Sequence, residues 1–369
     1  MAIALENRPG LVILAKLNSK RVTLRDVAER VGLSHVAISL ALRNHPSIPL
    51  KRRQEIKRVA EAMGYRPDPL LSSLAVYRHG QRPAGIQSSL AWINHWDQPE
   101  RLRQQHKEFD GYWRGAFQAA ARFGYRLEEI RWAEDCSARR FEQILLTRNV
   151  RGLLIPPHQS PPDWGEFDWS KFSVIRFGLS VRTPDSHLVT ADHLRAVVMA
   201  FEKMGRYGYR RIGLVVCGDF DRRLGGNYTG GCYAAQKLFK FQHALPPLMT
   251  DERSYREQPA KAKKTLQQWL SKHRPDAILT SVPQVPGMLR ESGYRIPEQV
   301  AVAGTSIYDV PVDAGINQNP EAIGRIAVEM LVGQINVNER GEPAAPCRIL
   351  VESLWQDGQS LPRRPAAEG

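Results

Sequence analysis

Residues 21–75 read RVTLRDVAERVGLSHVAISLALRNHPSIPLKRRQEIKRVAEAMGYRPDPLLSSLA. Apolar residues recur there at intervals of three and four, as on one face of a helix. The pattern predicts three short helices, at about 24–31, 35–42 and 51–63. Thr23 and Ser34 stand where the N-caps of the first two helices belong, and Gly32 is a stop signal. Because only Gly32 and Leu33 separate the first helix from the second cap, the two helices must meet steeply, which predicts a helix-turn-helix.

The residues expected to form the core of this head lie on one face of each predicted helix. They are Leu24, Val27, Ala28, Val31, Ile38, Ala41, Leu42, Ile56, Val59, Ala60 and Met63. Lys and Arg occupy the outer faces. A core of this size suits a module that inserts one helix into the major groove of DNA.

The charge of the chain is concentrated near its N-terminus. Residues 1–80 hold 14 Lys and Arg against 6 Asp and Glu, a net of +8 out of +14 for the chain. Such a basic block favours a polyanion, nucleic acid or a membrane surface, as the partner. A solvated basic face without a partner and a three-helix module unrelated to DNA are the alternatives.

Cysteines and hydropathy exclude several other classes. Cys136, Cys217, Cys232 and Cys347 stand far apart, so neither a zinc site nor a disulfide framework is expected. No apolar run approaches the ~20 residues that span a bilayer. Residues 1–20 lack a secretory signal and are expected to be a disordered extension or the result of a misassigned start. The sequence thus predicts a cytoplasmic protein, with no metal, cofactor or membrane partner.

From Ser88 onward, short apolar runs alternate with helical segments. Strands are expected at 90–94, 127–131, 152–156, 173–177, 212–217, 277–280 and 300–303. Helices are expected at 111–123, 138–146, 194–204, 230–239 and 260–272. The alternation predicts parallel sheets covered on both faces, and its two series predict two doubly wound lobes with a ligand cleft between them. The predicted fold class is therefore an all-α helix-turn-helix head followed by an α/β body.

The head resembles the DNA-binding head of the lactose-repressor family. The matching motifs are Thr-Leu-x-Asp-Val-Ala, Gly-Leu-Ser, Ile-Ser and Gly-Tyr-x-Pro, within residues 23–67. The body is similar to the periplasmic-binding-protein-like (type I) body of the same family. Its matching segments are 148–155, 189–192, 208–213, 293–304 and 324–331. The resemblance covers residues 21 to about 355.

The resemblance also implies the domain boundaries. We expect a head at 21–66, a hinge helix and linker at 67–85, an effector-binding and dimerisation domain at 86–355, and a tail at 356–369. The expected N-lobe is about 86–190 with 319–338, and the expected C-lobe is about 191–317 with 341–355.

By the same resemblance, the second helix is the recognition helix. His35, Val36 and Leu40 would then face base edges, and Leu40 departs from the longer polar residue of many relatives. The expected phosphate contacts, which fix register without reading sequence, are Thr23, Leu24 (by its amide), Ser34, Ser39, Arg43, Arg52 and Tyr65. Leu74, in the hinge, matches a leucine that wedges into the minor groove; an ordinary apolar linker residue is the alternative.

The family pattern is weaker in the expected effector cleft. Ser281 and Ser306 stand where many relatives carry carboxylates, and Asn227 replaces an Arg, although Arg223 lies just upstream. Loss of these groups removes strong partners for polyols and acids. The other expected cleft residues are Trp92, Asn94, Phe109 and Gln318. Each could equally be packing in the cleft wall, and a vestigial cleft without an effector is a further alternative.

These observations predict a sequence-specific DNA-binding transcription regulator, expected to be a repressor. It would bind a palindromic operator as a homodimer under control of a small-molecule effector, of which a sugar is one candidate. The tail carries no leucine heptad, so a dimer is expected, not a tetramer. No motif of nucleophilic, phosphate-binding or metalloprotease catalysis is found, so no catalytic residue is expected. A transporter's solute receptor and a cytoplasmic enzyme are the rival interpretations.

Overall fold

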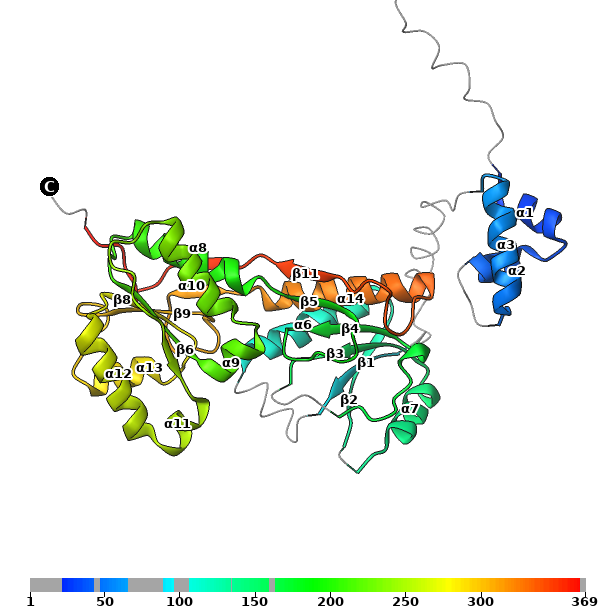
Figure 1. Cartoon of the computed structure of the whole chain (residues 1–369). Helices are drawn as coiled ribbons and strands as arrows, with labels where there is room; N and C mark the ends of the chain where they lie inside the picture. The colour runs from blue at the N-terminus through cyan, green and yellow to red at the C-terminus, as the bar shows by residue number, and fades with distance from the viewer. Residues whose placement is uncertain are drawn as a thin grey trace, which may run out of the picture. The chain divides into compact units, whose positions relative to one another are not determined.

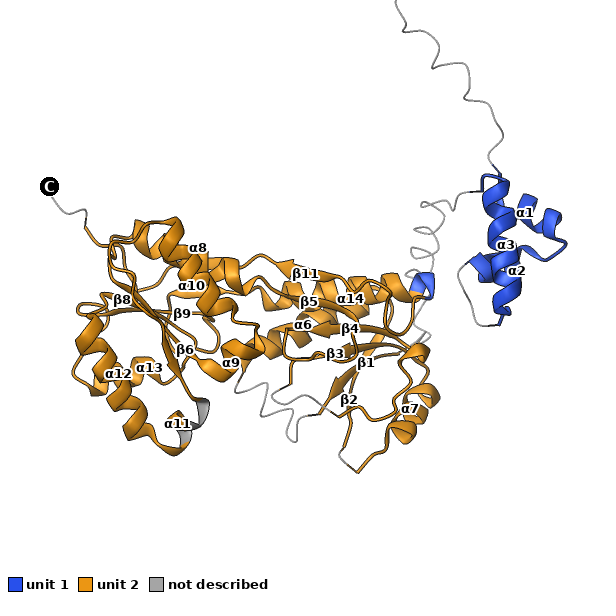
Figure 2. Ribbon diagram, viewed as in Figure 1, with its two compact units in different colours: residues 1–81, 336–338 blue, residues 82–335, 339–369 orange. Residues whose placement is uncertain are grey.

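A computed structural model describes residues 22–42, 47–65, 89–95, 106–133, 135–158 and 163–365. The chain divides into two compact units, residues 1–81 with 336–338 and residues 82–335 with 339–369 (Figure 2). We call residues 22–65 the head and residues 89–365 the body. None of the described helices is long and apolar enough to cross a membrane.

The head contains the three predicted helices. They are α1 (Leu24–Val31), α2 (His35–Leu42) and α3 (Leu50–Ala62). Thr23 and Asp26 form a reciprocal capping box at the start of α1, and Gly32 ends this helix with φ +70°. Ser34 accepts a hydrogen bond from the Ala37 amide (3.2 Å) at the start of α2. The buried core consists of Val27, Ala28, Ile38, Ala41, Ile56 and Ala60, all of them predicted.

The body contains two six-stranded sheets (Figure 1). The first, in the order β11-β5-β4-β3-β1-β2, is made of β1 (Ser89–Asn94), β2 (Arg126–Arg131), β3 (Val150–Ile155), β4 (Ser173–Phe177), β5 (His187–Ala191) and β11 (Arg348–Val351). The second, in the order β12-β10-β9-β8-β6-β7, is made of β6 (Ile212–Cys217), β7 (Leu248–Thr250), β8 (Ala277–Thr280), β9 (Ala301–Gly304), β10 (Gly315–Asn317) and β12 (Leu354–Gln356). Only the pair of β10 and β12 is antiparallel among these described strands. The predicted two-lobed, mostly parallel α/β body is confirmed.

Helices cover both sheets (Figure 1). Those of the first lobe are α6 (Lys107–Arg122), α7 (Ala138–Thr147), α14 (Pro320–Val337) and the 3₁₀ turn η1 (Trp169–Lys171). Those of the second lobe are α8 (His193–Arg206), α9 (Gly218–Arg223), α10 (Asn227–Leu238), α11 (Glu252–Glu257), α12 (Pro259–His273) and α13 (Val285–Glu291). The sequence analysis did not predict the short elements β5, β7, β10, β11, β12, α9, α11, α13 and η1, since a few residues show too little periodicity. It also did not predict the 18-residue helix α14.

The segments that join the lobes are hydrogen-bonded to one another. The Asp192 amide, after β5, donates to Val351 O (3.0 Å), and Asn319 Nδ2, after β10, donates to Glu352 O (2.7 Å). Asn319 has φ +54°, in the left-handed region that Asn tolerates. β11 pairs with β5 in the first sheet, although its residues fall within the range expected for the C-lobe.

The backbones of α6 and α14 approach each other unusually closely. A Cβ added at Gly115 would lie 2.0 Å from Glu321 O, and one added at Gly324 would lie 2.0 Å from Tyr112 O. Only glycine permits this separation. The contact fixes the N-terminal turn of α6 against the crossover that precedes α14.

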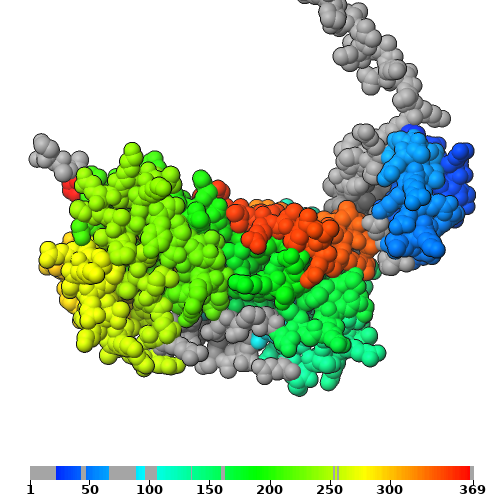
Figure 3. Space-filling model, in the orientation of Figure 1, coloured from blue at the N-terminus to red at the C-terminus, as the bar shows by residue number. Residues whose placement is uncertain are grey.

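The C-terminal segment packs onto the second lobe. Leu361 is 1% exposed within the core that also holds Tyr209. The Tyr209 hydroxyl donates to Pro362 O (2.8 Å), and the Arg364 guanidinium lies over the Tyr209 ring (4.4 Å). Figure 3 shows the orange and red surface along the first lobe and a small red patch at the far end of the second. The segment expected to be a tail is therefore a part of the body up to Arg364.

We predict that Leu361→Ala lowers the free energy of unfolding of the body by about 2–5 kcal/mol, because it leaves a cavity in a packed core. Leu354→Ala, on β12, is the matched control, since Leu354 is 56% exposed and its loss should change stability by no more than about 0.5 kcal/mol. Urea unfolding followed by tryptophan fluorescence measures both. Equal losses would contradict this role for Leu361.

Two glycines of α14 give a second test. Gly324→Ala should lower the free energy of unfolding by about 1–3 kcal/mol, because the new methyl group would overlap the α6 backbone. Gly333→Ala places its methyl group where nothing lies within 4 Å among the described residues, so it should raise stability by up to about 1 kcal/mol through helix propensity. If Gly324→Ala were also stabilising in thermal unfolding, the close contact would be refuted.

Candidate DNA-binding surface and interlobe site

The recognition residues lie at the start of α2. His35 is exposed, Val36 is 53% exposed, and Leu40 is half-buried. Ile38 and Ala41, on the opposite face, are fully buried in the head core. The helix therefore presents its first turn to a ligand while its other face is held by the core.

The candidate phosphate contacts are partly engaged within the head itself. The Thr23 hydroxyl donates to Asp26 Oδ2 (2.8 Å), and Arg52 Nη1 forms an ion pair with Glu55 Oε2 (2.6 Å). Leu24 is the first residue of α1, so its amide has no helical acceptor. Ser39 and Tyr65 are half-buried. Arg43 and Leu74 lie outside the described residues.

A buried polar cluster joins the two lobes of the body at the N-terminus of α6. Glu108, in the first turn of α6, is 8% exposed and accepts a hydrogen bond from Ser306, which follows β9. Asp309 accepts hydrogen bonds from the Lys107 and Glu108 amides, so a carboxylate of the second lobe caps a helix of the first. We call Glu108, Tyr228, Ser306, Asp309 and Gln318 the interlobe cluster.

The cluster extends to the crossover before α14. Gln318, 2% exposed, donates through Nε2 to Thr305 O (2.9 Å) and to the Tyr228 hydroxyl (3.2 Å). Tyr228 lies in α10, whose first turn is capped by the carboxylate of Asp221 (2.9 Å to the Tyr228 amide). His193 of α8 packs edge-on against the Tyr228 ring (5.5 Å). Residues from four separate elements thus converge at one place.

The electrostatics of the cluster follow from its burial. Burial, reinforced by the Asp309 carboxylate, raises the pKa of Glu108 well above its ordinary value. Burial also raises the pKa of Asp309, against the opposing effects of His106 and the Lys107 amide. Burial raises the pKa of Tyr228 as well, so this phenol is neutral. The cluster therefore holds two carboxyl groups that compete for ionisation.

The structure brings together only some of the expected effector residues. Ser306 and Gln318 are in the interlobe cluster, and Phe109 is next to Glu108 in α6, with its ring 5.9 Å from Tyr112. Ser281 follows β8, whose Thr280 carbonyl accepts from the Thr305 amide.

The remaining expected residues have other surroundings. Trp92 is 4% exposed and packs in the core of the first lobe against Phe177 (5.0 Å). Asn94 donates to Glu129 of the neighbouring strand (2.8 Å). The Arg223 guanidinium lies over the Phe220 ring (5.6 Å). Asn227 is half-buried at the start of α10.

Glu108, Tyr228 and Asp309 were missed by the sequence analysis. Ser306 replaces a family carboxylate, as the sequence showed, but Asp309 supplies one three residues later and Glu108 supplies another from the opposite lobe. Acidic residues are common in the first turn of helices, where they interact favourably with the helix dipole. Glu108 therefore did not stand out in the sequence as a residue at a lobe junction. The sequence analysis noted the missing carboxylates at 281 and 306 but did not name those at 108 and 309.

A second buried polar group lies in the first lobe. The His95 amide donates to His158 Nε2 (3.3 Å), and the His95 ring packs edge-on against Trp164 (4.8 Å). Burial lowers the pKa of His95 to about 4 and that of His158 to about 3. Both imidazoles are neutral at ordinary pH.

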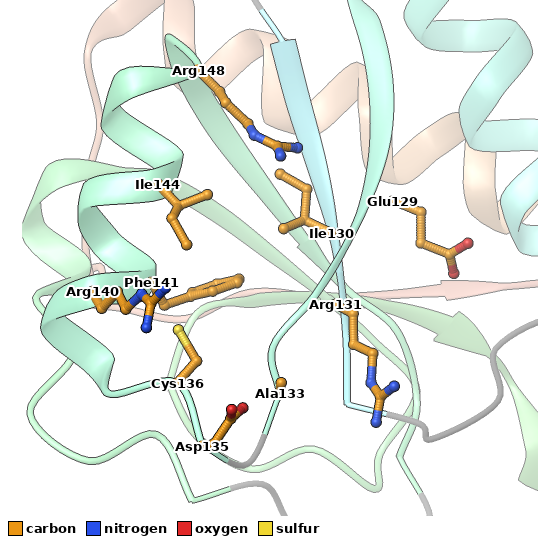
Figure 4. Close-up of a pocket in the computed structure, with 10 residues that line it drawn as sticks. All are labelled: Glu129, Ile130, Arg131, Ala133, Asp135, Cys136, Arg140, Phe141, Ile144 and Arg148. Atoms are coloured by element: carbon orange, nitrogen blue, oxygen red, sulfur yellow. The ribbon is translucent and has the colours of Figure 1, made fainter.

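A hollow of about 400 Å³ lies between β2 and α7 (Figure 4). Arg131, Arg140 and Arg148 line it together with Glu129 and Asp135, so its charge is mixed. None of its described lining residues has a buried polar atom without a partner. No group of three or more potential metal ligands occurs among the described residues. We assign no ligand to this hollow.

Comparison with known proteins supports the two-part organisation. A family model described as a periplasmic binding protein-like domain matches residues 201–361. The transcriptional regulator CelR, in complex with cellobiose, is 18% identical (TM-score 0.56, 92% of this chain and 100% of that chain). The lac repressor dimer, bound to operator and the anti-inducer ONPF, is 17% identical (TM-score 0.50, 93% and 99%).

The chain has the lactose-repressor fold. A ribose-bound LacI-family regulator from Enterococcus faecium is also similar, at 14% identity (TM-score 0.55, 75% of this chain and 100% of that chain). No curated protein sequence matches the chain. The resemblance and the fold class predicted from the sequence are thereby confirmed.

Two buried histidines, His158 and His193, and the half-buried His95 predict how the lactose-repressor fold of this chain responds to acid. Burial lowers the pKa of His193 to about 4, below the usual value of about 6.5. The unfolded chain therefore binds protons that the folded chain excludes, and stability present above pH ~6.5 is lost as the pH falls toward ~4. Urea unfolding at a series of pH values between 7.5 and 4 should show this loss for the body.

Glu108 and Asp309 contribute with the opposite sign, since their raised pKa favours the folded chain at low pH. The contribution of His193 is therefore isolated as a difference between variants. His193→Gln should unfold with a shallower pH dependence than the parent, whereas the exposed His243→Gln should keep the parent's dependence. If His193→Gln unfolds with the same pH dependence as the parent, then His193 can be protonated in the folded chain.

Proposed function

We propose that the protein is a sequence-specific DNA-binding transcription regulator of the lactose-repressor type, without catalytic activity. The observation that carries the proposal is the head, in which a buried three-helix core holds His35 and Val36 exposed on a helix-turn-helix. The head binds duplex DNA through α2 in the major groove, and the basic N-terminal part supplies the attraction to phosphate. Arg43 and Leu74 complete the interface as phosphate contact and minor-groove wedge.

The body controls the head. An effector binds between the lobes at the interlobe cluster and shifts the lobes about their hydrogen-bonded crossovers, which changes the spacing of two heads in a homodimer. The ligands bound in two similar structures, cellobiose and ribose, support a sugar-like molecule as the effector. Two-fold symmetry suits a palindromic operator, and repression is the proposed outcome of binding. The proposed domain boundaries are those expected from the sequence, except that β11 belongs to the first lobe and the second lobe extends to Arg364.

Selection of bound sequences from a random duplex pool tests this function. Val36→Ala should relax the preference at one base pair by about 1–3 kcal/mol, because Val36 packs on a base edge. Arg52→Ala should weaken binding to all sequences alike and flatten the salt dependence, because a phosphate contact carries no sequence information.

Arg122→Ala, in the last turn of α6, removes an exposed charge from the body and should alter neither property. A parent protein that enriches no sequence would refute the proposed function. An Arg52→Ala variant that changed base preference alone would refute the assignment of contacts.

A further inference from the structure

We propose that the effector carries a protonated amine, which the carboxylates of Glu108 and Asp309 hold between the two lobes. This inference rests on the proposed effector-controlled function and specifies the chemical class of the ligand. It comes from the interlobe cluster itself, where acceptors outnumber donors.

Each of the two carboxyl groups uses one oxygen within the protein and presents the other. Glu108 accepts from Ser306, and Asp309 accepts from the first amides of α6. Glu108 Oε1 and Asp309 Oδ1 are buried and have no hydrogen-bond partner among the described residues. A buried acceptor without a partner costs about 1–3 kcal/mol, more when it is charged. A ligand that donates to both oxygens would remove this cost.

A third acceptor belongs to the same cluster. The Thr305 carbonyl can only accept, so the Gln318 amide must turn its nitrogen toward Thr305. Gln318 Oε1 is thereby left buried and without a partner among the described residues. These three acceptors come from both lobes. A ligand with several N–H or O–H donors would form hydrogen bonds with all of them.

Charge distinguishes an amine from a neutral polyol. The Asp309 carboxylate is close enough to raise the pKa of Glu108, and the phenols of Tyr112 and Tyr228 beside them are neutral. His106 and Lys107 partly offset the charge of Asp309. Beside neutral hydroxyl groups Glu108 would stay protonated, whereas an ammonium group supplies three donors and a positive charge that favours both carboxylates in their ionised form.

The test is isothermal titration calorimetry on the full chain with probes matched in shape. Glucosamine, galactosamine and mannosamine are each compared with the parent hexose and with the N-acetyl derivative, and putrescine is compared with 1,4-butanediol. We expect at least one amine to bind about tenfold or more tightly than its hydroxyl counterpart. Titration in buffers of different ionisation enthalpy should show proton release, because the ligand's charge favours ionised Glu108.

Variants locate the site. Glu108→Gln and Asp309→Asn should each weaken binding of that amine at least tenfold and abolish its preference over the hydroxyl analogue. Asp110→Asn is the matched control, because Asp110 lies in the same helical turn but pairs with Arg114 (2.7 Å); it should change affinity less than twofold. Thermal unfolding confirms that each variant is folded.

Three outcomes would overturn the inference: no amine binds, a neutral or anionic analogue binds as tightly as its amine, or Asp110→Asn weakens binding as much as Glu108→Gln. These outcomes are separate from the DNA experiment. If the protein selects a duplex sequence but prefers neutral sugars, the proposed function stands and this inference fails. If it binds amines but no duplex, the amine site stands and the proposed DNA-binding function fails.

Discussion

The backbones of α6 and α14 meet at two glycines, and the position of the interlobe cluster follows from this contact. Gly115 and Gly324 admit carbonyl oxygens where any side chain would overlap them. α14 begins directly after the crossover that carries Gln318, so the close approach brings the first turn of α6 to that crossover. A helix N-terminus with its unpaired amides then lies against the loop after β9, where Asp309 accepts from them.

This arrangement explains why the acidic residues of the site stand at unexpected places in the sequence. A carboxylate at position 306 would repel Glu108 and Asp309 at the same junction. The hydroxyl of Ser306 instead donates to Glu108 and accepts from the Asp309 amide (3.2 Å). Ser306, Glu108 and Asp309 are therefore parts of one hydrogen-bonding arrangement.

Sequence reasoning was most successful where local physics decides the structure. The capping box at Thr23, the left-handed Gly32 and strands such as β6, β8 and β4 were predicted from periodicity and caps, and the head core was predicted residue by residue. Sequence reasoning failed where contacts between distant parts of the chain determine the surroundings of a side chain. Trp92 lies within the expected strand, but period-two alternation alone does not say which face of a doubly covered sheet a side chain takes. The packing of Leu361 and the pairing of Glu108 with Asp309 depend on contacts between residues about 60 to 200 positions apart.

A ligand can shift a two-state protein only by the difference between its affinities for the two states. The interlobe cluster provides such a difference, because Glu108 and the Asp309 cap come from opposite lobes and are brought together only when the lobes are apposed. Burying two like charges without a compensating cation destabilises the apposed arrangement, and protonation of one carboxyl relieves this only in part. A ligand that supplies the missing charge stabilises that arrangement selectively. Glu108 and Asp309 destabilise the apposed lobes when no cation is bound. The same two residues would therefore make the arrangement of the lobes depend on a cationic effector.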